Sequence, residues 1–200
     1  RVYTVGTARV VDPDTHEEVA EGLEGEIWLH CMCVGMGYWG KPELSKKTFS
    51  AELKGEPHRR YLRTGDYGFV YNGKLFICGR LKNMIIVGGT NYYCQDIEDT
   101  VVNSFPQSIR PGCVMAFSID NGADEELIIL AEARNPDDTH DELLKDIQST
   151  VKEGHGIIPS DIALLHPRTI PKTTSGKLRH AVARDQWLDN KAKLSIITTL

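Results

Sequence analysis

The sequence lacks the features that mark several large classes of protein. No apolar run approaches the roughly 20 residues that a bilayer-spanning helix needs, so we expect no membrane span. It has no Asn-x-Ser/Thr sequon, and its formal net charge of -5 gives no reason to expect a nucleic-acid partner. With 40% hydrophobic and 26% charged residues, the composition is ordinary for a soluble globular protein.

Cysteines are few and scattered, and their number, five, is odd. Cys31 and Cys33 would point the same way on a strand, but no second cysteine pair completes a zinc site. A free cysteine packs like a small hydrophobic residue. We therefore expect reduced, mostly packed thiols in a cytosolic protein with no metal site; the five are Cys31, Cys33, Cys78, Cys94 and Cys113.

The chain up to about residue 80 has the pattern of β-strands. Val2–Val11 and Gly25–His30 are strand-like, with Ile27 and Leu29 on one face. A hairpin is predicted where Asn72-Gly73 separates two apolar runs, because both residues tolerate the positive φ of a type I′ turn.

Beyond about residue 83 the pattern is mixed. Thr139 and Glu142 form a capping box, because each can satisfy a backbone donor of the other, and they predict the start of a helix. Ser195–Leu200 shows no clear order. The other predicted elements are strands at Met84–Val87, Cys113–Ser118, Glu126–Ala133 and Ile162–Leu165, and helices at Gln95–Ser104 and Leu178–Leu188.

These patterns predict an α+β fold with a β-rich part, a boundary near residues 80–83 and a small α+β domain. The boundary has no Gly/Ser linker, so any movement of the two parts would use a short hinge. Because the chain starts at Arg1 and not at Met, we expect it to be a piece of a larger protein.

Gly35–Gly40 matches the spacing G-x-G-x-x-G formally. A dinucleotide-binding fingerprint needs a helix directly after the glycines and an acidic residue about 20 positions on. Because Gly40-Lys41-Pro42 should break a helix start, we do not expect dinucleotide binding here.

Ser175-Gly176-Lys177 resembles the end of a P-loop, but Pro171 and Leu178 stand where that motif needs Gly and Ser or Thr. From Ile162 to Arg184 the sequence has no acidic residue, and its basic residues are Arg168, Lys172, Lys177, Arg179 and Arg184. Two interpretations stay open for this segment. It is a solvated surface loop, or Lys177 reaches a phosphate and offsets negative charge that develops in a transition state.

Asp66 and Arg80 are the other candidate site residues. Asp66 follows a glycine in Tyr61–Asp66, and its carboxylate could accept hydrogen bonds from a ribose diol or could cap a turn. Arg80 could hold ribose or phosphate oxygens, or could be a plain surface arginine.

The order and spacing of these segments resemble the motifs of the adenylate-forming enzymes, a superfamily that includes acyl-CoA synthetases, luciferases, peptide-synthetase adenylation domains and fatty acyl-AMP ligases. The resemblance covers nearly the whole chain. The segments that carry it are Gly37-Tyr38-Trp39 with Pro42-Glu43 and Thr48-Phe49, then Tyr61–Asp66, Gly79–Lys82 and Pro171–Lys177.

The resemblance implies a role for each candidate residue. Asp66 would bind the ribose hydroxyls of ATP, Arg80 would contact ribose or phosphate, and Lys177 would contact the carboxylate and the α-phosphate during adenylation. Lys82 would be the hinge residue. Residues 1–79 would be the last, β-barrel-like piece of a large N-terminal domain, residues 80–82 the hinge, and residues 83–200 a mobile C-terminal domain.

Within the superfamily, the segment Ile85–Glu98 is most similar to fatty acyl-AMP ligases, whose pattern is an aromatic followed by Pro-Gln-Asp-Ile-Glu. Cys94 stands where that pattern has proline, and Gly89 stands where a basic residue is frequent. The resemblance thus implies a cytoplasmic enzyme that adenylates a fatty acid with ATP and Mg²⁺ and passes it to an acyl carrier protein. The ligands of the metal would lie outside this chain, and the isolated chain would be inactive.

Two alternatives remain open. An acyl-CoA ligase would share the first step and use CoA as acceptor. A non-catalytic, ligase-like binding or regulatory domain would carry out neither step, although the presence of Asp66, Arg80 and Lys177 argues against it.

Overall fold

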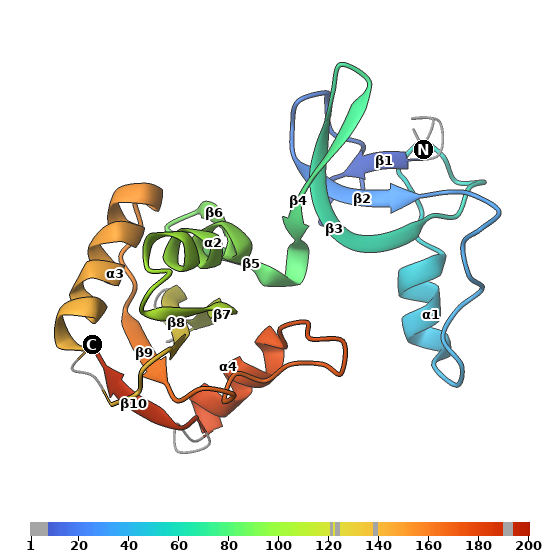
Figure 1. Cartoon of the computed structure of the whole chain (residues 1–200). Coiled ribbons are helices and arrows are strands. Elements are labelled where there is room, and N and C mark those ends of the chain that lie inside the picture. Colours follow the sequence, from blue (N-terminus) through green and yellow to red (C-terminus); the bar gives the residue numbers. More distant parts are fainter. Residues whose placement is uncertain (1–7, 121, 123–124, 138–139, 190–193) are drawn as a thin grey trace. The chain divides into compact units, whose positions relative to one another are not determined.

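The computed structural model describes residues 8–120, 122, 125–137, 140–189 and 194–200, and it divides into two compact units. The first unit is Arg1–Lys82 and the second unit is Asn83–Leu200 (Figure 1). Among the described residues, none of the helices combines the length and the apolar character that a membrane span requires.

The first unit is built on an antiparallel sheet of strands β1 (Ala8–Val11), β2 (Gly25–Leu29), β3 (Leu62–Tyr71) and β4 (Lys74–Arg80), in that order. Its buried core gathers Val11, Trp28, Ala51, Leu53 and Tyr61 around the indole ring, which is fully buried. The predicted strand Gly25–His30 is confirmed by β2. Of the predicted strand Val2–Val11, only β1 lies within the described residues.

The predicted hairpin at Asn72-Gly73 is confirmed, because these two residues join β3 to β4 and have φ values of 49° and 68°. Tyr71 pairs with Lys74 across this two-residue turn. The rings of Phe69 and Phe76 stack with their centroids 5.1 Å apart, which adds a cross-strand contact to the hairpin. The local sequence therefore set both the turn and the register.

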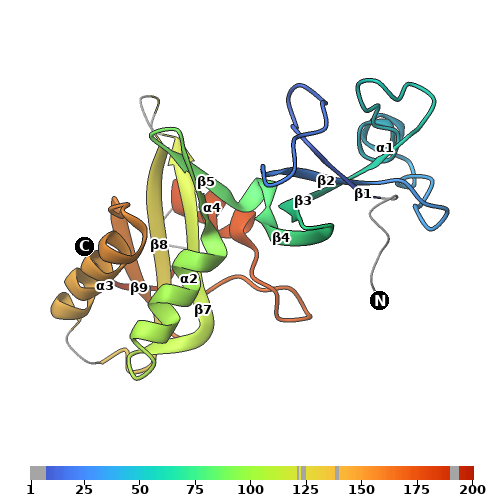
Figure 2. The ribbon, with the colours of Figure 1, turned by 90° about the horizontal axis from the view of Figure 1, so that it is seen from above.

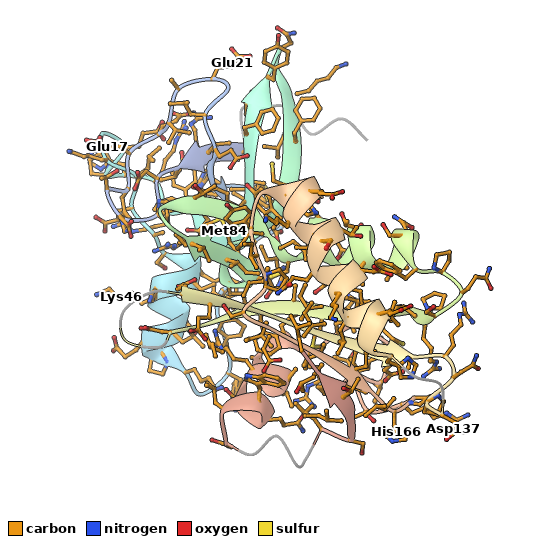
Figure 3. The ribbon with its side chains drawn as sticks, turned by 90° about the vertical axis from the view of Figure 1, so that its left-hand side faces the viewer. Glu17, Glu21, Lys46, Met84, Asp137 and His166 are labelled. Atoms are coloured by element: carbon orange, nitrogen blue, oxygen red, sulfur yellow. A yellow bond between two sulfur atoms is a disulfide. The ribbon has the colours of Figure 1, made fainter. Side chains whose placement is uncertain are left out.

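Helix α1 (Pro42–Phe49) corrects one prediction, since it begins only two residues after Gly40. Proline does not prevent a helix start when it occupies the first helical position, where its missing N–H has no intrahelical partner to lose. The segment still has no dinucleotide-binding context, because the strand before it, β2, belongs to an antiparallel sheet. Figure 3 shows Lys46 pointing outward from this helix.

The prediction of reduced cysteines is wrong for Cys31 and Cys33, which form a disulfide across one intervening residue. They lie in a turn after β2 rather than on a strand, and their Cα atoms are 5.4 Å apart, a normal separation for a bridged pair. The other three cysteines are not disulfide-bonded; Cys94 and Cys113 are buried and Cys78 is half-buried.

The second unit is centred on a sheet in the order β10 (Ile196–Thr199), β9 (Asp161–Leu165), β8 (Glu125–Ala133) and β7 (Ile109–Asp120). Strands β8 and β9 are parallel and the other neighbours are antiparallel. Helices α2 (Cys94–Ser104) and α3 (Asp141–His155) cover one face, and α4 (His180–Asp189) covers the other (Figures 1 and 2). The predicted α+β class is confirmed.

Strand alternation supplies both cores of this unit. Val114 and Ala116 pack toward α2 and α3, whereas Met115 and Phe117 pack toward α4 and its Trp187. A sheet buried on both faces needs apolar residues at nearly every central position, which is why Leu127–Ala131 of β8 and Ile162–Leu165 of β9 are apolar throughout.

The second unit begins with a short hairpin. The 3-10 turn Leu81–Asn83 leads into β5 (Met84–Val87), which pairs with β6 (Thr90–Tyr93) and confirms the predicted strand. At the start of α2 the Cys94 thiol donates a hydrogen bond to the carbonyl oxygen of Asn83. The first residue of the second unit is therefore tied to its first helix.

The expectation that Ser195–Leu200 lacks order is wrong, because Ile196–Thr199 forms β10. This edge strand pairs with β9, and its β-branched residues suit a strand. The predicted capping box cannot be compared, since Thr139 lies outside the described residues; the N-cap position of α3 is occupied by His140. Predicted helices Gln95–Ser104 and Leu178–Leu188 agree with α2 and α4 to within two residues.

Candidate active site

Asp66 and Arg80 lie directly opposite each other on neighbouring strands β3 and β4. Arg80 Nε donates to Asp66 Oδ1 at 2.9 Å, and the side chains are 54% and 32% exposed, respectively. The pair is thus open to solvent, and it presents a carboxylate and a guanidinium side by side. This arrangement can bind a ligand that carries both hydroxyl donors and anionic oxygens.

A buried carboxylate, Glu26, holds the segment that precedes Asp66. Its oxygens accept from Arg63 Nε at 2.8 Å, from the Gly65 backbone N–H at 3.1 Å and from Trp28 Nε1 at 3.0 Å. Gly65 has a φ of 71°, so a residue with a side chain would be strained at this position. Glu26 was not among the predicted site residues; the signal for it was a lone acid within an apolar strand.

Thr64 provides further hydrogen bonds that hold the backbone of this segment. Its hydroxyl donates to the carbonyl oxygen of Ile27 at 2.6 Å and accepts from the Asp66 backbone N–H at 3.0 Å. The backbone of Asp66 is therefore held by hydrogen bonds on both of the residues before it. The structure brings Asp66 and Arg80 together within the first unit.

Lys82 is exposed and lies within the 3-10 turn, and the division between the two units falls immediately after it. Lys177 belongs to the second unit and is described there on its own.

Lys177 lies near the tip of a small hairpin formed by residues 171–179, which projects from the second unit ahead of α4 (Figures 1 and 2). The Thr173 N–H donates to the Lys177 carbonyl oxygen at 2.8 Å, and the Lys177 N–H donates to Thr173 Oγ1 at 3.0 Å. Gly176, with a φ of 81°, closes the turn. The segment is thus an ordered turn with an exposed lysine.

The stem that leads into this hairpin is fastened by Glu132, a buried residue of β8. Its carboxylate accepts from the Ile170 backbone N–H at 2.9 Å and pairs with Arg110. Burial raises the pKa of this carboxyl, but hydrogen bonds from the backbone of Arg168 and Ile170 and from Cys113 outweigh burial and hold the pKa below its usual range.

The stem that leaves the hairpin is fastened by Glu98, a buried residue of α2. Its Oε1 lies 2.6 Å from Nε2 of His180, the first residue of α4, and accepts from the Ala116 backbone N–H at 3.0 Å. Neither Glu98 nor Glu132 was predicted as functional. Glu98 stood at an inner position of a predicted helix beside Ile97, which was a signal that an acid is buried.

The basic residues predicted around Lys177 all have exposed side chains in the second unit; they are Arg168, Lys172, Lys177, Arg179 and Arg184. Lys172 Nζ also lies 3.1 Å from the Cys113 sulfur. Among the described residues, no group of three or more His, Cys, Asp or Glu side chains could hold a metal ion.

Comparison with known proteins gives the family. FadD25 of Mycobacterium tuberculosis, named as a fatty-acid–CoA ligase, is 40% identical over 86% of this chain and 31% of its own length. The long-chain-fatty-acid–AMP ligase FadD26 of Mycobacterium marinum is 38% identical over 90% of this chain and 32% of its own length. The solved structure of McyG A-PCP with phenylalanyl-adenylate matches 92% of this chain and 32% of that chain, with a TM-score of 0.77 and 26% identity.

A family model described as Disco-interacting protein 2-like, AMP domain, matches residues 82–197, which is more than half of the chain. The chain therefore belongs to the adenylate-forming enzymes and, within them, to this AMP-domain family. It spans about a third of the length of the curated relatives that it matches.

Proposed function

We propose that the full-length protein containing this chain activates a fatty acid by converting it to an acyl-adenylate. The observation that carries the proposal is the exposed Lys177 on an ordered, basic hairpin, in a chain that also pairs Asp66 with Arg80. The name of the relative FadD26, a long-chain-fatty-acid–AMP ligase, supports the fatty acid as substrate.

In the proposed first step, a carboxylate oxygen of the fatty acid attacks the α-phosphorus of ATP while the bond to pyrophosphate breaks. Negative charge gathers on the oxygens around phosphorus, and the ammonium group of Lys177 would stabilise it. Asp66 would accept hydrogen bonds from the ribose hydroxyls, and Arg80 would contact ribose or phosphate. Mg²⁺ would accompany ATP through ligands outside this chain.

In the proposed second step, the acyl group passes to the thiol of an acyl carrier protein and AMP leaves. Residues 83–200 would act as the mobile domain, turning about Lys82 in the hinge 80–82, while residues 1–79 remain with the N-terminal domain. Carrier proteins of this kind would be acidic, and the exposed basic residues from Arg168 to Arg184 offer a complementary surface. The isolated chain would be inactive, and the full-length enzyme would act in the cytoplasm.

CoA is the alternative acceptor, and the name of the relative FadD25 favours it. A non-catalytic binding domain would transfer an acyl group to neither CoA nor a carrier protein, and it would release no pyrophosphate.

The test is an assay of the full-length protein for pyrophosphate release from ATP, with and without a long-chain fatty acid, followed by an acceptor assay. We expect release that depends on the fatty acid, and transfer to carrier protein faster than to CoA. Rapid acyl-CoA formation would show that the acceptor is CoA and not a carrier protein. No fatty-acid-dependent release would contradict the proposed activity and favour the binding domain.

A further inference from the structure

Two buried carboxylates fasten the two stems of the Lys177 hairpin. Glu132 is 1% exposed and Glu98 is 3% exposed, and neither lies in the hairpin itself. Glu132 accepts a hydrogen bond from the Ile170 N–H on the stem before the turn, and Glu98 contacts the His180 ring on the stem after the turn. A buried carboxylate is retained only when it is paired and hydrogen-bonded, as both of these are.

Glu98 connects the two helical layers around the edge of the sheet. Strand β7 is an edge strand with β8 on its inner side, so the Ala116 N–H that reaches Glu98 faces the open edge. The same Oε1 meets His180 at the start of α4, on the other side of the sheet from α2. The contact spans 82 positions in the sequence and lies only three residues after Lys177.

Hydrogen bonds continue from the stems of the hairpin to its tip. The Arg179 N–H donates to the Pro171 carbonyl oxygen at 3.0 Å, and the Thr173–Lys177 bonds continue the ladder to the turn. Lys172 also contacts Cys113, whose thiol in turn donates to Glu132. The orientation of the two stems therefore determines where the Lys177 side chain begins.

We propose that Glu98, through its contact with His180, and Glu132, through its contact with Ile170, are positioning residues that aim Lys177 during adenylation. The inference rests on the proposed function, because it assumes that Lys177 acts on the α-phosphate. Neither buried carboxylate is proposed to touch substrate. Each acts by fixing one stem of the hairpin, and a lysine displaced by about 1 Å can lose on the order of a hundredfold in rate.

The test compares His180→Leu with His180→Gln in the full-length protein. Leucine removes the donor that meets Glu98, whereas the glutamine side chain can place an N–H near the position of the histidine Nε2. Glu98→Met is the second variant, since it nearly keeps the length of the side chain but removes the oxygen that meets His180. The matched controls are His166→Leu and Glu153→Met, which change exposed residues of the same unit.

Each variant is assayed for acyl-AMP formation and, separately, for acyl transfer to a thiol from supplied acyl-AMP. We expect His180→Leu to lower kcat for acyl-AMP formation about tenfold or more, with transfer within about twofold of wild type and with the KM for ATP unchanged. His180→Gln should recover most of the loss, Glu98→Met should show the same selective loss, and both controls should match wild type.

Equal losses in both half-reactions would show a merely structural role and overturn the inference, as would a His180→Gln variant no better than His180→Leu. If His180→Leu does not fold, the ratio of the two half-reactions in Glu98→Met decides the matter alone. Lys177→Ala in the same assays separates this inference from the proposed function. Normal acyl-AMP formation by Lys177→Ala would contradict the proposed function. If Lys177→Ala loses acyl-AMP formation while the His180 and Glu98 variants keep it, only this inference fails.

Discussion

Asp66 and Lys177 are held in different ways in their two units. Asp66 lies inside a long strand, one residue after Gly65, which Glu26 binds directly. Lys177 lies at the tip of a projecting hairpin, and its restraints are at the stems. A buried carboxylate on another element can therefore restrain a residue in either of two ways. It can bind the adjacent backbone within a sheet, or it can hold the stems of a hydrogen-bonded hairpin at a distance from the residue.

The first prediction breaks the arrangement in the first unit. Glu26→Ala leaves Arg63 and the Gly65 N–H without their buried partner, so we expect it to cost about 3–5 kcal/mol of unfolding free energy. Amide hydrogen exchange should speed up across β3 and stay slow in α3. Glu21→Ala, at an exposed residue that Figure 3 shows at the periphery, is the control and should change little. Unchanged exchange in β3 would show that Glu26 does not clamp this segment.

The second prediction tests the ligand-binding role of the same unit. Asp66→Ala removes the carboxylate proposed to accept from ribose, and a charged hydrogen bond of this kind is worth about 1.5–3 kcal/mol. Affinity of the full-length protein for ATP, measured by calorimetry, should fall roughly tenfold to a hundredfold. Asp66→Asn, which keeps an acceptor oxygen, should fall less. Wild-type affinity in Asp66→Ala would refute the ribose role.

The third prediction uses acid to loosen the stem of the hairpin. The pKa of Glu132 is lower in the folded protein than its ordinary value of 4.5, so its contribution to stability is fully present above that value and is lost as pH falls through the lower, folded pKa. Unfolding of the second unit, followed by hydrogen exchange in β9, should become easier below about pH 4.5. Glu132→Gln should flatten this dependence; an equally steep dependence in the variant would assign it to other groups.

The fourth and smallest effect concerns thiols. Burial raises the pKa of Cys94 to about 12, and its thiol donates to Asn83, whereas Cys78 of the first unit is half-buried. Since the thiolate is the reactive form, a thiol reagent at pH 8 should label Cys78 long before Cys94. Mass spectrometry of the labelled peptides gives the order. Equal labelling of both cysteines in the folded protein would show that the start of α2 opens readily.

Local features were predictable from the sequence because neighbouring residues decide them. The Asn72-Gly73 turn needed only two residues that accept positive φ, and β5 and α2 needed only their apolar spacing. The hairpin of Lys177 was predicted as a loop before a helix. Its ordered turn was not, because the bonds that close it depend on Thr173 meeting Lys177.

The buried carboxylates escaped prediction for a different reason. The contacts of Glu26 with Arg63, of Glu132 with Ile170 and of Glu98 with His180 join residues 37, 38 and 82 positions apart, so no local pattern contains both partners. Strand β10 was missed because its order comes from pairing with β9, although Ile196–Thr199 is rich in β-branched residues. The roles of Asp66, Arg80, Lys82 and Lys177 came from the resemblance and remain predictions.

The most direct test of the central claim is Lys177→Ala in the full-length protein, with both half-reactions measured. Loss of one preorganised charge at the reacting centre should slow acyl-AMP formation on the order of a hundredfold or more. Transfer of the acyl group from supplied acyl-AMP should proceed at the wild-type rate. Acyl-AMP formation at the wild-type rate in this variant would contradict the assignment of Lys177 as the catalytic residue.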